Sequence, residues 1–476
     1  MEPSMFNVRV SLEDRGEVFL INTLTDAQLL VSDDVAELLD RVGRGTNEWT
    51  NEECEALTTL VENGFIVESA EADHRNLREF FDGIRESREQ LRMTVLTTLQ
   101  CNFACDYCIQ GDHGDYNRHA ARMSLETAEQ IAGWTERRLD QLAPATYVLT
   151  FFGGEPLLNL PVVYYLSERL WNACQQRRIR MLINVITNGL LLTPEVVDRL
   201  APFGLNGVKI TLDGERDTHN RMRPLRGGQG TFDRIIANIR QVANRCHITI
   251  GGNFDATSVE SYPALLDFLR DQEFADRLAK VAFKPIIRQA QGTAPSPAPR
   301  GSKFIPLTAV SADERPLNGA CMTSTGTSTG ACDSCHELDD QMAFLREETR
   351  KHGFPTVDGV HMGPCDIHKR HSYTIGIDGG LYACPGFAAD AHQSTGHVDG
   401  RTDPLRARTA ERFDALAAWK ECGDCAFIPV CAGGCTVAAH NELGDMNRPA
   451  CHKRALEAGV VALARDVVAQ LPASIG

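Results

Sequence analysis

The sequence lacks the features of a membrane protein or a secreted protein. No run of apolar residues approaches the length of about 18 that a membrane-spanning helix requires. Residues 1–7 contain neither the basic n-region nor the apolar h-region of a signal peptide. We therefore expect a soluble, cytoplasmic protein with no membrane partner.

An excess of positive charge is also absent. The 48 Lys and Arg residues are outnumbered by 64 Asp and Glu residues, which gives a formal net charge of −16 at pH 7. Nucleic acids and anionic membranes bind basic surfaces, and this composition offers little from which to build one. We therefore expect no nucleic-acid partner.

Cysteine, in contrast, is abundant, with 16 residues in a chain of 476. A reducing cytoplasm does not support a disulfide framework, so most of these thiols are better explained as metal or cluster ligands. Many of them fall within the segment 365–451. Cys54, Cys174 and Cys246 lie in helical or apolar stretches instead, and we expect them to be small core residues.

Three cysteines are gathered in one short loop, Cys101, Cys105 and Cys108. A [4Fe–4S] cluster needs four ligands, so a loop with three thiolates leaves one iron open to a small molecule. Open coordination is typical of metal sites that do chemistry. A zinc knuckle is the alternative, but zinc loops usually combine two Cys-x2-Cys pairs, and no second pair lies nearby.

The middle of the chain, residues 76–290, repeats a strand–helix unit. Apolar strands are expected at 93–99, 147–152, 181–186, 207–212, 248–254 and 281–287. Helices are expected to start near Ser124, Leu160, Thr193, Thr231 and Ser258. This alternation predicts an α/β fold with a parallel sheet, which right-handed crossovers curve into a partial (β/α)6 barrel.

Three further segments flank this barrel. Residues 1–75 combine short strands at 8–10, 18–21, 29–31 and 64–67 with helices opening at Ser32 and at the capping box of Thr50 and Glu53, so we expect a winged-helix-like module. A linking helix follows at about 75–90. Residues 291–364 form a bridging region with a helix at about 336–352, and residues 365–476 form a Cys-rich domain.

Candidate ligand-binding residues follow successive strands of the barrel. Ligands of βα architectures bind at the carboxyl ends of the strands, and this is where the sequence places Gly153, Gly154, Glu155, Asn188, Thr211 and Asp213. Glycines allow a ligand to approach the backbone, and a carboxylate can accept from a substrate ammonium. A purely structural role in turns stays open for Asn188 and Asp213.

These motifs together resemble those of the radical S-adenosylmethionine (SAM) enzymes that carry a C-terminal SPASM domain. The resemblance rests on the loop at 101–108, GGEP at 153–156, TLDG at 211–214 with His219 and Arg223, and the helix start at 230–234, and it covers about 91–455. It implies that Cys101, Cys105 and Cys108 hold a [4Fe–4S] cluster that binds SAM.

The resemblance also implies roles for single residues at the SAM site. Tyr107 would back the adenine, while the Gly153–Gly154–Glu155 turn would face the methionine amino group. Thr211 would lie near the ribose and Arg223 would meet the SAM carboxylate. A solvated arginine at the surface is the alternative for Arg223.

The Cys-rich domain matches the seven-cysteine SPASM pattern, which implies two auxiliary [4Fe–4S] clusters and three clusters in all. The resemblance assigns one cluster to Cys422, Cys425, Cys431 and Cys451, and the other to Cys365, Cys384 and Cys435. Cys332 or Cys335 is a candidate fourth ligand of the second cluster, which could otherwise ligate substrate. A zinc ribbon is the alternative for residues 422–435, because zinc sites also use Cys-x2-Cys pairs.

The resemblance implies that an electron from a donor such as flavodoxin or ferredoxin cleaves SAM to a 5′-deoxyadenosyl radical, which abstracts hydrogen from the substrate. The N-terminal module is similar in layout to the leader-recognition elements of peptide maturases, which bind a leader as an added strand. We therefore expect a maturase that installs a crosslink or related oxidation on a precursor peptide with a leader.

Two alternatives stay open at this point. One is an anaerobic sulfatase maturase that forms formylglycine; those enzymes carry Asp directly after the cysteine of a Gly-x4-Cys element, where this chain has Pro385. The other is a non-catalytic iron–sulfur or zinc scaffold, which would leave the SAM-site motifs unexplained.

Overall fold

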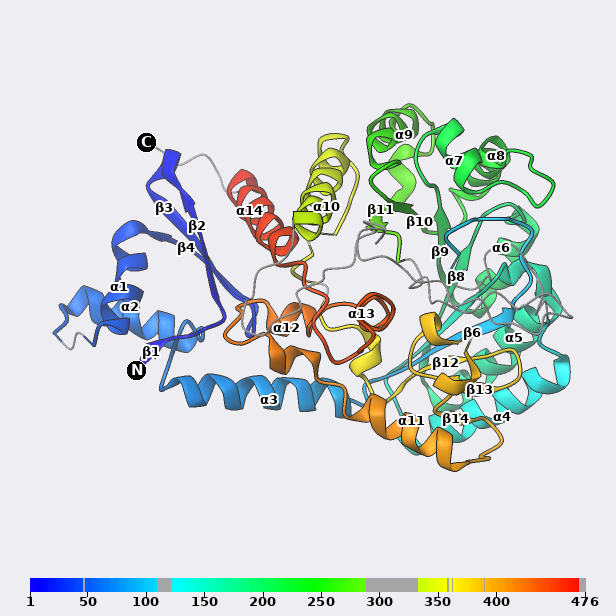
Figure 1. Cartoon of the computed structure of the whole chain (residues 1–476), viewed down its shortest axis with the longest axis horizontal. Coiled ribbons are helices and arrows are strands. Elements are labelled where there is room, and N and C mark those ends of the chain that lie inside the picture. The colour runs from blue at the N-terminus through cyan, green and yellow to red at the C-terminus, as the bar shows by residue number, and fades with distance from the viewer. Residues whose placement is uncertain are drawn as a thin grey trace, which may run out of the picture.

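A computed structural model describes residues 1–45, 48–108, 121–287, 333–357, 359–361, 363–388 and 390–470. Within these ranges the strands form a nine-stranded, a three-stranded and a two-stranded sheet. The large sheet and its helices lie at one end of an elongated molecule, and the small sheets lie at the other end (Figure 1). No helix in the described ranges is long and apolar enough to cross a bilayer.

All six predicted barrel strands are confirmed. They are β6 (Gln90–Thr98), β7 (Thr146–Gly153), β8 (Arg180–Thr187), β9 (Leu205–Thr211), β10 (Ile248–Phe254) and β11 (Leu278–Pro285). Each pairs in parallel with the next, from β6 to β11. The α/β class and the partial barrel therefore follow the sequence-based expectation.

The helices between these strands also begin near the predicted residues. They are α4 (Leu125–Leu142), α5 (Leu160–Arg177), α6 (Pro194–Leu200), α8 (Phe232–Val242) and α9 (Tyr262–Arg270). The Ser124 hydroxyl caps α4 by accepting from the backbone N–H of Thr127, and Pro194 occupies the first turn of α6. The expected start at Ser258 is a 3-10 turn, and α9 begins four residues later.

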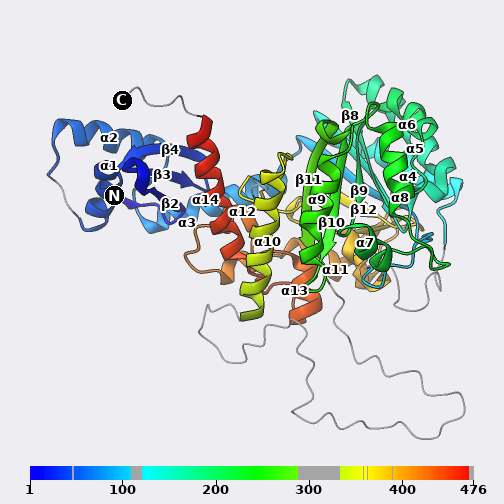
Figure 2. The same cartoon turned by 90° about the horizontal axis from the view of Figure 1, so that it is seen from above.

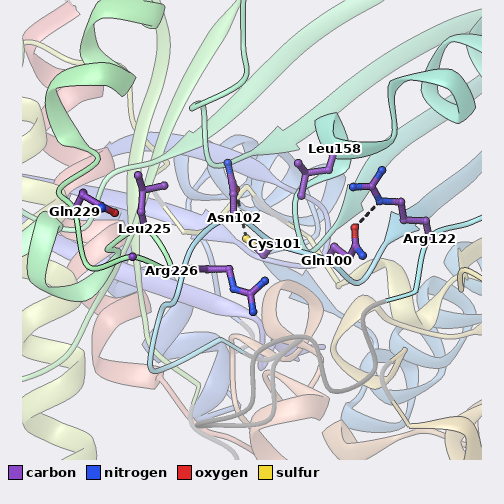
Figure 3. A pocket seen from close by; sticks show the side chains of 9 residues that line it. Gln100, Cys101, Asn102, Arg122, Leu158, Leu225, Arg226 and Gln229 are labelled. Atoms are coloured by element: carbon purple, nitrogen blue, oxygen red, sulfur yellow. Dashed lines mark hydrogen bonds between the residues drawn. The ribbon is translucent and has the colours of Figure 1, made fainter.

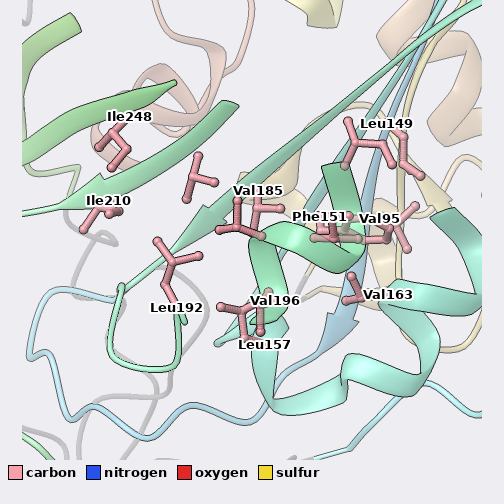
Figure 4. Packing of buried hydrophobic residues seen from close by; sticks show 14 of the residues in the cluster. Val95, Leu149, Phe151, Leu157, Val163, Val185, Leu192, Val196, Ile210 and Ile248 are labelled. Carbon is pink, nitrogen blue, oxygen red and sulfur yellow. The ribbon is translucent and has the colours of Figure 1, made fainter. Parts of the chain in front are cut away.

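Buried and partly buried side chains alternate along the strands, and this alternation distinguishes the two faces of the sheet. Val95, Phe151, Val185 and Ile210 are buried and pack toward the helices, for instance near Val163 of α5 (Figure 4). The residues between them, such as Thr94, Thr150 and Asn184, are only partly buried. Because successive side chains of a strand point to opposite faces, these partly buried residues line the inside of the barrel.

The sheet continues beyond the predicted strands. β12 (Ser372–Ile375) pairs in parallel with β6, and β13 (Gly380–Tyr382) and β14 (Gly396–His397) extend it in antiparallel fashion. Strands of two to four residues show no periodic pattern, and the sequence therefore gave no sign of them. They join the predicted Cys-rich domain to the barrel through continuous backbone pairing. The short helix α7 (Arg216–Met222) was likewise not predicted.

The N-terminal module has the predicted order of elements. The antiparallel strands β2 (Asn7–Leu12), β3 (Glu17–Asn22) and β4 (Ala27–Ser32) precede α1 (Asp33–Gly43) and α2 (Asn51–Glu62), whose capping box is formed by Thr50 and Glu53. The strand β5 (Ile66–Val67) pairs with β1 (Glu2–Pro3). The helix expected at about 75–90 is α3 (Ala70–Glu86), which begins five residues earlier.

Both faces of the three-stranded sheet are covered. Val18 and Leu20 pack toward α1 and α2, whereas Phe19 and Ile21 pack against Val460 of α14 (Lys453–Gln470). The helix α10 (Asp333–Lys351) packs on α14 and confirms the helix expected at 336–352 (Figure 2). The C-terminal helix therefore connects the N-terminal module to the rest of the molecule.

The three cysteines expected in cores differ in their surroundings. Cys174 is fully buried in α5, as predicted, and Cys246 is partly buried. The prediction was wrong for Cys54, which is exposed on α2. The apolar face of α2 is carried by Leu57 and Leu60, and position 54 lies off that face.

Candidate active site

The three-cysteine loop follows β6 and is held by backbone bonds to the segment after α7. Phe103 and Leu225 form an isolated antiparallel bridge. The N–H of Ala104 donates to the carbonyl of Pro224 at 2.9 Å, and the N–H of Arg226 donates to the carbonyl of Asn102 at 3.1 Å. The thiol of Cys105 is buried, and those of Cys101 and Cys108 are partly buried. The fold thus brings the three predicted ligands together at the carboxyl end of β6.

Gly153 and Gly154 lie against the backbone that leads into this loop. A Cβ at Gly154 would lie 2.2 Å from the Gln100 carbonyl oxygen, and one at Gly153 would lie 2.3 Å from that of Thr98. The N–H groups of Gly154 and Glu155 donate to these same two oxygens at 2.8 Å. The glycines are therefore needed for the approach of β7 to the cysteine loop, and their predicted contact with SAM stays a prediction.

We expect Gly154→Ala to lower the free energy of unfolding by about 1–3 kcal/mol, because the new methyl group overlaps a backbone oxygen that cannot rotate away. Gly133→Ala is the matched control, since its Cβ would meet only the Arg137 guanidinium at 3.7 Å inside helix α4. This control should be neutral or stabilise by up to about 1 kcal/mol. Urea unfolding of both variants measures the difference, and equal stability of the two would contradict the close approach.

Glu155 is a fully buried carboxylate that ties the ends of β7 and β8 together. Its Oε1 accepts from the Thr187 hydroxyl at 2.8 Å and from the Leu157 N–H at 3.0 Å, and its Oε2 accepts from the Asn188 N–H at 2.8 Å. Burial raises the pKa of this carboxyl, while the three hydrogen bonds and the charge of Arg223 act to lower it.

Asn188 connects this carboxylate to the cysteine loop. Its side-chain amide donates to the Asn102 side-chain oxygen at 2.7 Å and lies 3.8 Å from the Cys101 sulfur. An amide donor beside a cysteine sulfur stabilises the thiolate form that binds iron. The turn at 187–189 therefore faces the three-cysteine loop, as its position after a predicted strand led us to expect.

Tyr107, Asp213 and Arg223 form a buried polar network next to the same loop. The Tyr107 hydroxyl donates to Asp213 Oδ2 and accepts from Arg223 Nη1 at 2.5 Å. Asp213 Oδ1 accepts from the backbone N–H of Asn253 at 2.6 Å, and Arg223 Nη1 lies 3.4 Å from Asp213 Oδ2. Both oxygens of Asp213 are thus engaged by protein donors. This geometry makes Asp213 a positioning residue.

Arg223 is not a solvated arginine, because only 9% of its surface is exposed. Its Nε is buried and has no partner in the described part of the chain. A buried donor without an acceptor is costly, and a bound carboxylate would satisfy it. The unpartnered Nε is therefore compatible with the prediction that Arg223 binds the SAM carboxylate. Thr211, the predicted ribose neighbour, lies on the inner face of β9.

The side chains at this site fit the SAM-binding [4Fe–4S] cluster that the motifs imply. Three thiols on one loop, a buried unpartnered guanidinium nitrogen and a glycine-lined turn meet at the ends of β6, β7 and β9. Burial raises the pKa of Cys101 to about 11 and that of Cys105 to about 12. Loading of iron must therefore release protons from these thiols.

A pocket of about 420 Å³ opens beside Cys101 (Figure 3). It is lined by Gln100, Cys101, Asn102, Arg122, Leu158, Leu225, Arg226, Gly227 and Gln229. Arg122 donates through its Nε to the Gln100 side chain. The sequence-based reasoning missed Arg122 and Arg226, because an isolated arginine in a loop carries no motif.

The described C-terminal cysteines lie near one another in two groups. Burial and the neighbouring thiols of Cys431, Cys425 and Cys451 raise the pKa of Cys422 to about 12. Burial likewise raises the pKa of Cys384 to about 12, and its neighbours are Cys365 and Cys435. Cys332 lies outside the described residues, as does the side chain of Cys335 at the start of α10.

No group of three Cys, His, Asp or Glu side chains in the described ranges is close enough to surround a single metal ion. The four sulfurs of a zinc site all lie about 2.3 Å from one ion, whereas the ligands of a [4Fe–4S] cluster bind separate irons. The assignment of cluster ligands stays a prediction.

The comparisons with known proteins agree with this site. Residues 95–254 match the Radical SAM superfamily. The chain is 24% identical over 410 residues to Fe-coproporphyrin III synthase of Methanosarcina barkeri, which covers 76% of this chain and 88% of that protein. It is 25% identical over 382 residues to pre-heme d1 synthase of Dinoroseobacter shibae, with 76% and 86% covered.

Solved structures share the fold. The AdoMet-bound protein anSMEcpe is 15% identical and superposes with a TM-score of 0.56, covering 80% of this chain and 96% of that chain. This chain contains a radical SAM domain, whose sequence match spans β6 to β10.

Proposed function

We propose that this protein is a radical SAM enzyme with auxiliary iron–sulfur clusters that oxidatively modifies a ribosomally made peptide, for instance by a crosslink. The observation that carries the radical chemistry is the loop of Cys101, Cys105 and Cys108, fixed beside the buried donor of Arg223. When bound, a SAM-ligating [4Fe–4S] cluster supplies a 5′-deoxyadenosyl radical from SAM and one electron.

The chain's own residues would position the reactants and exclude water. Cys101, Cys105 and Cys108 would ligate three irons, and Arg223 would hold the SAM carboxylate. Asp213 and Glu155 keep the surrounding turns in place through buried hydrogen bonds. The cysteine groups around Cys422 and Cys384 would hold auxiliary clusters that accept an electron from the substrate. A flavodoxin or ferredoxin would be the donor, and the cytoplasm the compartment.

The peptide assignment rests on the N-terminal module. β4 pairs only with β3 among the described strands, so its second edge can accept an added peptide strand. A protein of the same fold, anSMEcpe, has been crystallised with AdoMet and a peptide. This likeness concerns the fold alone, and the peptide is proposed from the strand edge.

The sulfatase-maturase alternative is less well supported. Pro385 occupies the position after Cys384 where those enzymes carry Asp. The nearby Asp378 is engaged in a turn, because its Oδ1 accepts from the N–H of Gly380 at 3.0 Å.

A tetrapyrrole substrate is the second candidate. The specific observation in its favour is the match to Fe-coproporphyrin III synthase and pre-heme d1 synthase over most of both chains. Those names describe enzymes that make tetrapyrroles, and a tetrapyrrole substrate of this chain would react at the same radical site.

One experiment separates these substrates. Anaerobic protein with SAM and reductant is incubated either with peptides encoded by small open reading frames beside its gene or with tetrapyrroles that carry carboxylate side chains. We expect a peptide to lose hydrogen and to stimulate 5′-deoxyadenosine release. Porphyrin modification without any peptide modification would establish the second candidate instead.

A further inference from the structure

Three lysines lie on the inner face of the barrel. Thr249 of β10 is in register with Lys209 of β9 on one side and with Lys280 of β11 on the other, and Asn253 is in register with Lys284. Residues in register on parallel strands point to the same face. Val208 and Ile210 pack into the helix layer, so Lys209 points to the inside.

The Lys209 side chain extends over Gly251 toward the carboxyl ends of the strands. A Cβ at Gly251 would lie 2.6 Å from Lys209 Cε and 3.5 Å from its Nζ. Two residues further along β10, the Asn253 side chain donates to the Tyr107 hydroxyl at 3.2 Å and to Asp213. The lysine ammonium groups are therefore next to the active-site network.

Among the described residues, no carboxylate pairs with these ammonium groups. In the described part of the chain, Lys209, Lys280 and Lys284 form neither an ion pair nor a side-chain hydrogen bond. Burial, followed by the charges of Lys284 and Lys280, lowers the pKa of Lys209 to about 8. Lys209 is partly buried, whereas Lys280 and Lys284 are exposed. A partly buried ammonium with two further lysines near it costs stability, which suggests that the group serves an anionic ligand.

Lys284 also links this cluster to the second group of cysteines. Its charge acts on the Cys384 thiol and lowers the pKa that burial raises. Lys284 is thus near enough to both Lys209 and Cys384 for its charge to act on each. A substrate that passes an electron from the radical site to the predicted cluster at Cys384 would come near this lysine.

We propose that Lys209 and Lys284 bind a carboxylate of the substrate inside the barrel. This inference rests on the proposed function, because it concerns the substrate of the same site. An acidic side chain of a peptide and a propionate of a porphyrin share this chemistry, and both remain arms of the test.

The test measures binding to the reconstituted protein by fluorescence titration. The probes are Fe-coproporphyrin III against its tetramethyl ester, and a fluorescently labelled precursor peptide against its Asp→Asn and Glu→Gln form. We expect the wild-type protein to bind one acid probe at least about tenfold more tightly than its neutral counterpart, which identifies the source of the carboxylate. We expect Lys209→Met and Lys284→Met each to remove most of that preference.

Two further variants serve as controls. Lys209→Arg keeps the charge and should keep most of the preference for the acid probe. Lys453→Met removes an exposed lysine of α14 that faces Glu457 and should bind like the wild-type protein. SAM binding is titrated in parallel, because loss of SAM affinity in Lys209→Met with an unchanged probe preference would assign the lysine to SAM and overturn the proposal.

Equal binding of acid and neutral probes by the wild-type protein in both arms would also overturn it. Release of 5′-deoxyadenosine by the wild-type protein is measured separately. Its absence rejects the proposed function, whereas its presence with unchanged probe binding in the lysine variants rejects this inference alone.

The unpaired ammonium predicts a dependence of stability on pH. The pKa of Lys209 is about 8 in the folded chain and near its ordinary 10.5 in the unfolded chain. Between these values the unfolded chain binds more protons, so the Lys209 contribution makes stability rise with pH over this window. We expect Lys209→Met to be more stable than the wild-type protein at pH 7.5, and this advantage to shrink by pH 10. Urea midpoints at both pH values measure the effect, and an advantage that is independent of pH would contradict it.

Discussion

Replacing Cys105 with alanine is expected to reduce 5′-deoxyadenosine formation to background. Cys105 is the buried member of the three-cysteine loop, and the loop is fixed by backbone bonds on both sides of it. With two thiolates left, the cluster loses one of its three protein ligands. The described C-terminal cysteines lie near other cysteines of their own group and so do not replace it. The anaerobically reconstituted variant should also contain about four fewer iron atoms per chain.

Cys246→Ala is the matched control for this change. Cys246 lies in the same domain, after helix α8, and is partly buried. Its replacement should leave both iron content and 5′-deoxyadenosine formation unchanged. Retained product in Cys105→Ala, or equal losses in the two variants, would show that the loop does not hold the SAM-cleaving cluster.

Replacing Asp213 with alanine is expected to have the second-largest effect. Asp213 is fully buried and accepts from Tyr107, Asn253 and Arg223. Its removal leaves the Arg223 guanidinium buried without its counter-charge, which costs about 3–5 kcal/mol in the free energy of unfolding. The displaced Arg223 and Tyr107 should in addition lower 5′-deoxyadenosine formation about 100-fold, since small misplacements at a reactive centre have effects of this size.

Tyr107→Phe distinguishes positioning from simple loss of stability. It removes the hydrogen bonds that the Tyr107 hydroxyl makes with Asp213, Arg223 and Asn253, and it leaves the ion pair between Asp213 and Arg223 in place. We expect a loss of about 1–3 kcal/mol in stability, less than for Asp213→Ala, and a smaller loss of product. At a temperature where all variants are folded, Asp213→Ala should still raise the SAM dissociation constant because Arg223 has moved. An unchanged affinity for SAM would contradict the positioning role.

The sequence predicted the barrel well because each strand is a long apolar run with a clear period. The same reasoning found the cysteine loop and the turns at Gly153, Asn188 and Asp213, since spacing alone carries their chemistry. The sequence-based reasoning predicted that Asp213 binds the cofactor. In the structure, both carboxylate oxygens of Asp213 accept hydrogen bonds from protein donors. Which atoms a carboxylate faces depends on tertiary contacts such as that with Asn253, which lies 40 residues away in sequence.

Other features left no local signal. The strand β12 has four residues, and it joins the large sheet by pairing with β6, far away in the sequence. Lys209 looks like an ordinary strand lysine until the register with β10 and β11 places it beside Lys280 and Lys284. The pocket arginines Arg122 and Arg226 are likewise brought together by loops that start from different strands.

The most direct test of the central claim combines two measurements on one sample. The protein is purified without oxygen, its iron and zinc are counted, and it is then incubated with SAM and a strong reductant. Three clusters predict about twelve irons per chain, little zinc, and formation of 5′-deoxyadenosine and methionine. Bound zinc, few irons and intact SAM would contradict the account and leave a metal-stabilised scaffold.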